Sequence, residues 1–144
     1  MIKRDRDSGQ GTTPSDVMAQ FQANAVAPLF LTRTLLPRLR PGAKVALVSS
    51  RMGSIADNGY GGYYGYRMSK AALNAAGASL AHDLKAAGIA VVILHPGAVR
   101  TGMTGGQGAI EPNASAAGLL QRIDELELRT TGRFLHVDGN VLPW

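Results

Sequence analysis

The sequence predicts an α/β fold in which helices cover both faces of a parallel sheet. Three short apolar runs, at 44–50, 89–97 and 133–139, each follow a segment with helical periodicity. Strands separated by helices of this length are joined by right-handed crossovers and lie parallel. With 144 residues, 45% of them hydrophobic and 17% charged, the chain has a globular composition and the size of one domain.

The first predicted helix begins after a polar, glycine-bearing stretch, residues 1–12, which we interpret as a disordered lead-in to a domain of residues 13–144. Thr13 is a suitable helix cap, followed by Pro14 at the first helical position. The helix runs to about residue 40, where "RPG" ends it. Pro28 and Pro37 are expected to bend or fray it.

The remaining elements follow in alternation. The run 44–50 is typical of a strand buried on both faces, and a glycine-rich loop separates it from an alanine-rich helix at 64–87. Small residues on more than one face of that helix suit close packing of another helix. A second strand at 89–97 leads into a second long loop, and a helix at 114–128 precedes the last strand.

Composition argues against several classes of function. The chain has no cysteine, which excludes disulfides and thiolate metal sites and makes a cytoplasmic setting the default expectation. No apolar stretch is long enough to span a membrane, and neither metal-ligand spacing nor paired carboxylates are found. The net charge of +5 comes from scattered basic residues, so we expect no nucleic-acid partner.

Both long loops follow the carboxyl ends of strands, where ligands bind in parallel α/β sheets. Ser50 ends the first strand, and Tyr66 and Lys70 are spaced four apart on the next helix, so their side chains share one face. The spacing alone is also compatible with an amphipathic surface helix.

Four motifs carry a family resemblance: "NAVAPLFLTRTLLPRL", "VALVSSRMGS", "YRMSK" and "LHPGAVRT". In this order they resemble the catalytic half of the short-chain dehydrogenases/reductases, and the loop "SIADNGYGGYYGY" with the ending "DGNVLPW" is similar to carbonyl-reductase-like members. The resemblance implies a partial Rossmann-like, doubly wound parallel sheet. It also implies hydride transfer between a nicotinamide cofactor, NAD or NADP, and a carbonyl or alcohol substrate.

The resemblance implies a role for each catalytic position. Tyr66 would exchange the proton, and Lys70 would favour its phenolate form and hydrogen-bond the nicotinamide ribose. Ser50 would hold the substrate oxygen, and Asn24 matches the asparagine that holds a water linking the lysine to solvent. The segment expected to orient the nicotinamide carboxamide comprises Pro96, Gly97, Val99 and Thr101.

Each position also has a structural interpretation. Ser50 could cap a strand end, Asn24 could satisfy a helix kink near Pro28, and "HPG" could be only a turn. We interpret His95 as a structural hydrogen-bonding residue at a buried strand end. The other histidines, His82 and His136, have no partner pattern in the sequence.

The sequence lacks the family's strand followed by a TGxxxGxG phosphate loop. The resemblance therefore implies that the N-terminal cofactor-binding strands are missing, that NAD(P) binds weakly, and that the purified chain oxidises no NAD(P)H with simple aldehydes or ketones. The helices at 14–40 and 64–87 correspond to the family's dimer interface, so a homodimer is expected. The alternative function is a non-catalytic dimerising fragment that pairs with another subunit; a nucleic-acid binder would require salt-sensitive binding.

Overall fold

The computed structural model describes residues 13–144, so the lead-in expected at 1–12 lies outside the described residues. Its sheet has three parallel strands, β1 (Lys44–Val48), β2 (Ala90–His95) and β3 (Arg133–His136), in the order β1-β2-β3. All three carboxyl ends meet at one edge, where His95 lies opposite His136. The predicted alternation of helices and strands is confirmed, as is the parallel sheet.

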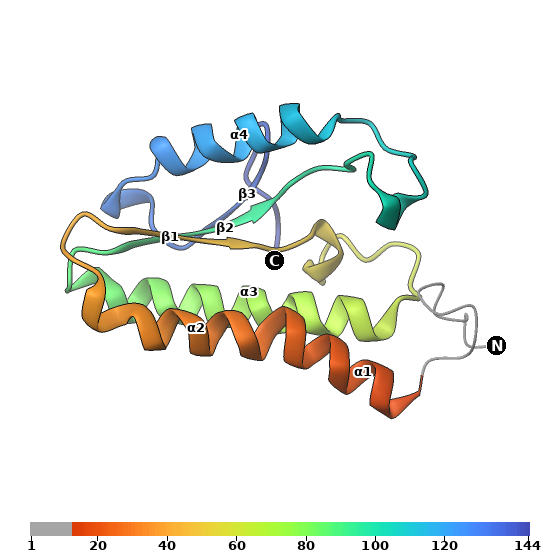
Figure 1. Ribbon diagram of the computed structural model, residues 1–144, viewed down its shortest axis with the longest axis horizontal. Coiled ribbons are helices and arrows are strands. Elements are labelled where there is room, and N and C mark those ends of the chain that lie inside the picture. The colour runs from red at the N-terminus through yellow and green to blue at the C-terminus, as the bar shows by residue number, and fades with distance from the viewer. Residues whose placement is uncertain (1–12) are drawn as a thin grey trace.

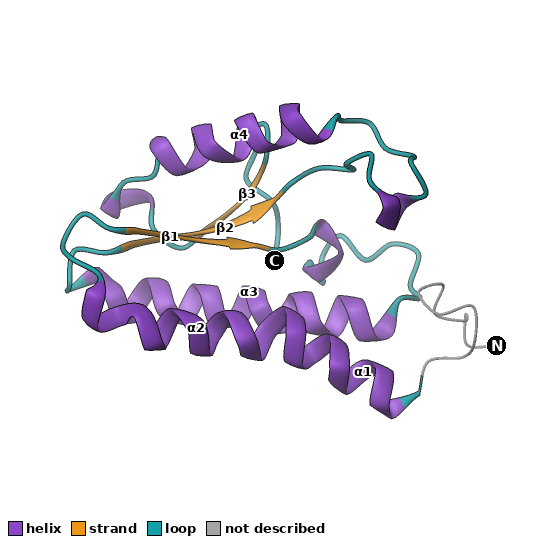
Figure 2. Ribbon diagram, viewed as in Figure 1, coloured by secondary structure: helices purple, strands orange, loops and turns teal. Residues whose placement is uncertain are grey.

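Helices lie on both faces of this sheet (Figure 1). On one face are α1 (Pro14–Phe21), α2 (Ala27–Leu35) and α3 (Tyr64–Lys85), and on the other is α4 (Pro112–Asp124). Figure 2 shows that coil and short helical turns make up the segments beyond the carboxyl ends of β1 and β2. Within the described residues, no helix combines the length and the apolar character that crossing a bilayer requires.

The first helix continues through its prolines by changing its winding. Asp16 and Thr13 form a capping box at its start. Pro28 has no N–H to donate to the carbonyl of Asn24, and here the chain adopts a wider π-helical turn, η1 (Gln22–Val26), in which the Ala27 N–H donates to the Gln22 carbonyl. The helix then tightens into a 3₁₀ turn, η2 (Leu36–Arg38), and ends two residues earlier than expected.

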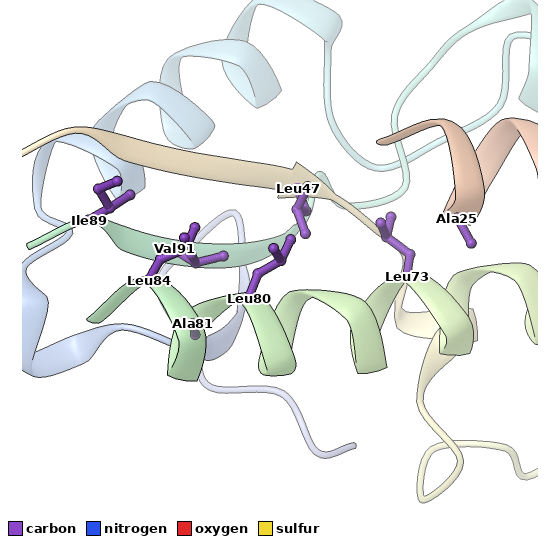
Figure 3. Close-up of a cluster of buried hydrophobic side chains, with 8 residues drawn as sticks. All are labelled: Ala25, Leu47, Leu73, Leu80, Ala81, Leu84, Ile89 and Val91. Carbon is purple, nitrogen blue, oxygen red and sulfur yellow. The ribbon is translucent and has the colours of Figure 1, made fainter. Parts of the chain in front are cut away.

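The core between the sheet and α3 is made of aliphatic side chains. Figure 3 shows Leu47 and Val91 from the sheet facing Leu73, Leu80 and Leu84 of α3. A close approach of α3 to the sheet completes this layer, because a Cβ added at Gly77 would lie 2.6 Å from Ile93 Cγ1 and 3.0 Å from Leu47 Cδ1. At Gly77 the missing side chain therefore admits the sheet, while α3 also packs against α1, as its small residues suggested.

The opposite face of the sheet packs against α4. Ala90, Val92 and Leu94 of β2 are buried there with Leu126. Lys44 at the start of β1 donates from Nζ to the carbonyls of Ile123 and Asp124, at 2.8 and 2.9 Å, which places a cation at the carboxyl end of the helix. The strand beginnings and α4 are thereby held together at the edge opposite the candidate site.

Candidate active site

Beyond the end of β1, the chain turns tightly through η3 (Arg51–Gly53), with Ser50 as its cap. Ser50 is only 8% exposed, and its Oγ accepts a hydrogen bond from the Met52 N–H at 3.2 Å. The neighbouring Ser49 donates from Oγ to Asn74 Oδ1 of α3 at 2.5 Å. Ser50 therefore does cap a turn, and that turn lies directly against the helix that carries Tyr66 and Lys70.

Close packing at Gly53 sets the distance between this turn and α3. A Cβ added at Gly53 would lie 2.8 Å from the carbonyl carbon of Lys70, closer than side chains tolerate. The missing side chain lets the backbone after Ser50 touch the helix backbone at the position of the candidate lysine. The serine and the lysine are brought to the same end of the sheet by this contact.

Tyr66 and Lys70 lie one turn apart near the start of α3. The Lys70 ammonium is 5.8 Å from the centroid of the Tyr66 ring and donates to the Val48 carbonyl, the last residue of β1, at 3.0 Å. Burial lowers the pKa of Lys70, because desolvation disfavours its charged form. The ammonium is thus held between the end of the strand and the phenol ring.

Asn24 reaches this region through Ser69. Its Nδ2 donates to Ser69 Oγ at 3.0 Å, and Ser69 Oγ donates in turn to the Tyr66 carbonyl at 2.8 Å. Ser69 is fully buried, whereas Asn24 is half-buried. The structure thus ties Asn24 to the helix turn between Tyr66 and Lys70.

The loop after β2 lies at the same edge of the sheet and is anchored to α4 and to Ile110. Pro96 accepts a hydrogen bond from Ser115 Oγ at 2.7 Å, and Val99 forms a parallel bridge with Ile110. Gly97 adopts φ +82°, a conformation that favours glycine. Thr101 is exposed and caps the short turn η4 (Gly102–Thr104), its N–H donating to Thr104 Oγ1 at 3.0 Å.

The two histidines at the strand ends lie side by side. His95 Nδ1 is buried without a hydrogen-bond partner, so the hydrogen bond expected of His95 is not formed by that atom. Burial, His136 and Arg51 together lower the pKa of His95 to about 4. His136 does have partners, which the sequence pattern did not indicate: its ring centroid lies 5.2 Å from that of His95, and its Nδ1 lies 2.9 Å from Asp138 Oδ1.

Arg67 is the residue of this region that sequence reasoning missed. It is 8% exposed and is the one charged residue classed as buried in the described part of the chain. The signal was its heptad spacing from Asn74 and Ala81, which places it on a buried face of the helix. In the same described part, no three histidine or carboxylate side chains converge in a way that could hold a metal ion.

Comparison with known proteins identifies the family. The model of the short chain dehydrogenase family matches residues 5–111, and the chain belongs to this family. The chain is 45% identical over 132 residues to 1-hydroxy-2-glutathionyl-2-methyl-3-butene dehydrogenase of Rhodococcus sp. (strain AD45), covering 89% of this chain and 58% of that protein. It is 46% identical over 132 residues to the C-signal protein of Myxococcus xanthus, covering 90% of this chain and 80% of that protein.

Solved structures of carbonyl reductases have the same fold. The carbonyl reductase Sniffer of D. melanogaster superimposes with a TM-score of 0.90 at 33% identity, and the NADPH-bound carbonyl reductase from chicken fatty liver does so with 0.88 at 30% identity. Each match covers 100% of this chain and 63% of the other. The fold is therefore a partial Rossmann-like fold of carbonyl-reductase type, spanning somewhat less than two thirds of those chains.

Proposed function

We propose that the chain carries the catalytic end of an NAD(P)-dependent oxidoreductase that transfers hydride between nicotinamide and a carbonyl or alcohol carbon. The observation that carries this proposal is the position of the Lys70 ammonium. It bonds the last carbonyl of β1 and lies beside the Tyr66 ring, next to the turn that begins at Ser50. Family membership and the carbonyl-reductase neighbours, one of them NADPH-bound, support the same chemistry.

The residues present fit the nicotinamide end of such a cofactor. Lys70 donates one of its three N–H groups to Val48, and an ammonium has two more for ribose hydroxyls. The backbone at Gly97 and the exposed Thr101 lie on the loop at the same sheet edge, where they would meet the carboxamide. The sequence has no glycine-rich phosphate loop, so we propose that the dinucleotide binds weakly to this chain.

The proposed chemistry divides among three side chains. When bound, the nicotinamide would supply the hydride for reduction of a carbonyl and accept it in oxidation of an alcohol. Ser50 Oγ orients the substrate oxygen, and the Tyr66 hydroxyl gives that oxygen a proton during reduction and takes it back during oxidation. Lys70 favours the phenolate between these steps, because a nearby cation stabilises the charged form. Asn24 holds the backbone of this helix turn through Ser69.

A titration of the labelled protein with NADPH or NADH tests this proposal. We expect the amide resonances of Tyr66, Lys70 and Thr101 to shift progressively, with a Kd in the millimolar range, which corresponds to about −4 kcal/mol. Lys70→Met should weaken binding, while Lys85→Met, at the far end of α3, should leave it unchanged. If millimolar cofactor shifts none of the three resonances, the proposal is wrong. A cofactor-dependent turnover lost in Tyr66→Phe would contradict only the weak-binding part.

A second candidate function is a dimerising fragment, in which two copies pair through the first helix and α3. The apolar side chains left exposed on these helices favour it. On α1 and α2 they are Met18, Phe30, Leu31 and Leu35, between 43% and 68% exposed, and on α3 they are Tyr64 and Met68, at 47% and 50%. Solvated apolar side chains gathered on packed helices are typical of a protein interface.

A further inference from the structure

Arg67 is buried under unusual conditions for a cation. Among the described residues it forms no ion pair, and its Nε and Nη2 atoms are buried without a hydrogen-bond partner. Leaving buried donors unpaired lowers the stability of a fold, and an apolar side chain of similar volume would avoid that cost. The contribution of Arg67 must therefore be sought in the contacts that it does make.

Those contacts join three segments around the candidate site. Arg67 Nη1 donates to the Met52 carbonyl at 3.3 Å, and its guanidinium carbon lies 4.7 Å from the centroid of the Tyr60 ring. Its backbone N–H donates to the carbonyl of Tyr63 at 2.8 Å in the first turn of the helix, and Tyr63 is the one non-glycine residue in the described chain with a positive φ, +53°. The Arg67 side chain thus links α3, on which it lies, to η3 and to the loop that follows η3.

The contact with Met52 bears directly on Ser50. The Met52 N–H donates to Ser50 Oγ at 3.2 Å, and the Gly53 N–H donates to the Ser50 carbonyl at 2.8 Å. The peptide group between Met52 and Gly53 accepts a hydrogen bond from Arg67 at its carbonyl and donates one from its N–H to the Ser50 carbonyl. A shift of the Arg67 side chain would therefore also shift Ser50. Arg67 is also the immediate neighbour of Tyr66, so one buried side chain connects the helix turn that carries Tyr66 to the turn that carries Ser50.

We propose that Arg67 is a positioning residue, which holds the turn carrying Ser50 against the helix start carrying Tyr66. This inference rests on the proposed function for its purpose, and on the Arg67 contacts for its geometry. Misplacing a reacting group by about 1 Å can lower the rate about a hundredfold. A side chain that fixes Ser50 relative to Tyr66 would therefore help to keep the reaction rate high. We expect its effect to be local, because a buried cation with two unpaired donors adds little to the stability of the fold.

The test compares Arg67→Met and Arg67→Lys with Arg38→Met, the same substitution at an exposed arginine in η2. Amide hydrogen exchange is followed at Met52, Gly53 and Ser54, whose N–H groups all bond within this turn. In Arg67→Met we expect exchange of these amides to rise about tenfold or more relative to Val92 and Ile93, which corresponds to loss of about one hydrogen bond's stabilisation. The Tm should stay equal or rise.

The lysine variant separates positioning from simple packing. Lysine keeps a cation and an N–H donor at the Met52 carbonyl, so Arg67→Lys should restore part of the protection that methionine loses. Unchanged exchange at the turn in Arg67→Met, or a loss of protection that spreads equally to Val92 and Ile93 with a lower Tm, would overturn the proposal. Hydrogen exchange needs no cofactor, so the two proposals can fail separately. If NADPH did not shift the Tyr66 amide resonance, the proposed function would be wrong, but the result for Arg67 would still hold.

Discussion

Individual side chains at the carboxyl edge of the sheet are held in states that cost stability. His95 carries a buried ring nitrogen without a partner, beside a second histidine and within the field of Arg51. Lys70 is partly desolvated, and Arg67 is buried with two unpaired donors. Perturbed and incompletely paired polar groups gather at functional sites, because a site needs charges that are not already neutralised.

The depressed pKa of His95 predicts an acid-dependent loss of stability. The folded state keeps His95 neutral down to about pH 4, whereas the unfolded chain protonates near the ordinary value of 6.5. The associated stability is complete above pH 6.5 and is lost as the pH falls from 6.5 to about 4. Allowing for partial exposure of the ring, the loss is roughly 1–2 kcal/mol.

Urea unfolding of His95→Leu between pH 4 and pH 8 measures this contribution. The substitution should flatten the pH dependence of the free energy of unfolding within that window by the stated amount. The control is His82→Leu, the same substitution at an exposed position of α3 away from the strand ends. Equal slopes for His95→Leu and the unsubstituted chain would show that His95 titrates normally in the folded state.

At the scale of elements, α3 connects the core to the candidate site. Its first two turns carry Tyr66, Arg67 and Lys70, while later turns pack Leu73, Leu80 and Leu84 against the sheet. The helix approaches the strands closely only because a glycine, Gly77, faces Ile93. Any change that lifts the helix at this point should therefore also shift its first turns relative to Ser50.

Gly77→Ala tests this close approach. An added Cβ 2.6 Å from Ile93 Cγ1 forces a repacking of the buried sheet, which costs about 1–3 kcal/mol. Helix propensity alone would give the opposite sign, since alanine is favoured over glycine by about 1 kcal/mol. Urea unfolding should thus show a net loss of stability. The reverse substitution at an exposed position, Ala75→Gly, should cost only the propensity difference, and a stabilised Gly77→Ala would contradict the packing seen here.

At the scale of the whole molecule, the two helical layers are unequal. The α1–α2–α3 face exposes large apolar side chains along its helices, including Leu31 at 61% exposure, while the opposite face exposes Leu120 of α4 at 62%. Two equally exposed leucines on opposite faces allow the role of each face in assembly to be separated. The proposed homodimer uses the first of these faces.

Light scattering coupled to size exclusion tests the proposed dimer. We expect a mass of about twice 15.1 kDa for the unsubstituted chain. Leu31→Glu should shift the mass toward the monomer, because a charge cannot be buried unpaired in the interface. Leu120→Glu should leave the dimer intact. A monomer at micromolar concentration, or dissociation by both substitutions alike, would remove the basis for the second candidate function.

The sequence by itself determined the order of elements and the edge of the sheet where chemistry is expected. The apolar runs, the Thr13 cap and the spacing of Tyr66 from Lys70 are local patterns. Such patterns can be recognised in the sequence without knowledge of the fold. The same reasoning located the disturbed helix near Pro28, since a proline has no N–H to donate in any context. Whether Ser50, Tyr66 and Lys70 perform the proposed chemistry stays a prediction.

Only the tertiary structure decided which groups meet across the chain. Three contacts depend on how turns and strands are placed against α3 and against each other. They are the contacts of Arg67 with Met52, of Asn24 with Ser69, and of His95 with His136. Such contacts join residues far apart in sequence, through side-chain directions that periodicity does not specify. Burial follows from the same packing, and it is burial that leaves Arg67 and His95 with unpaired nitrogen atoms.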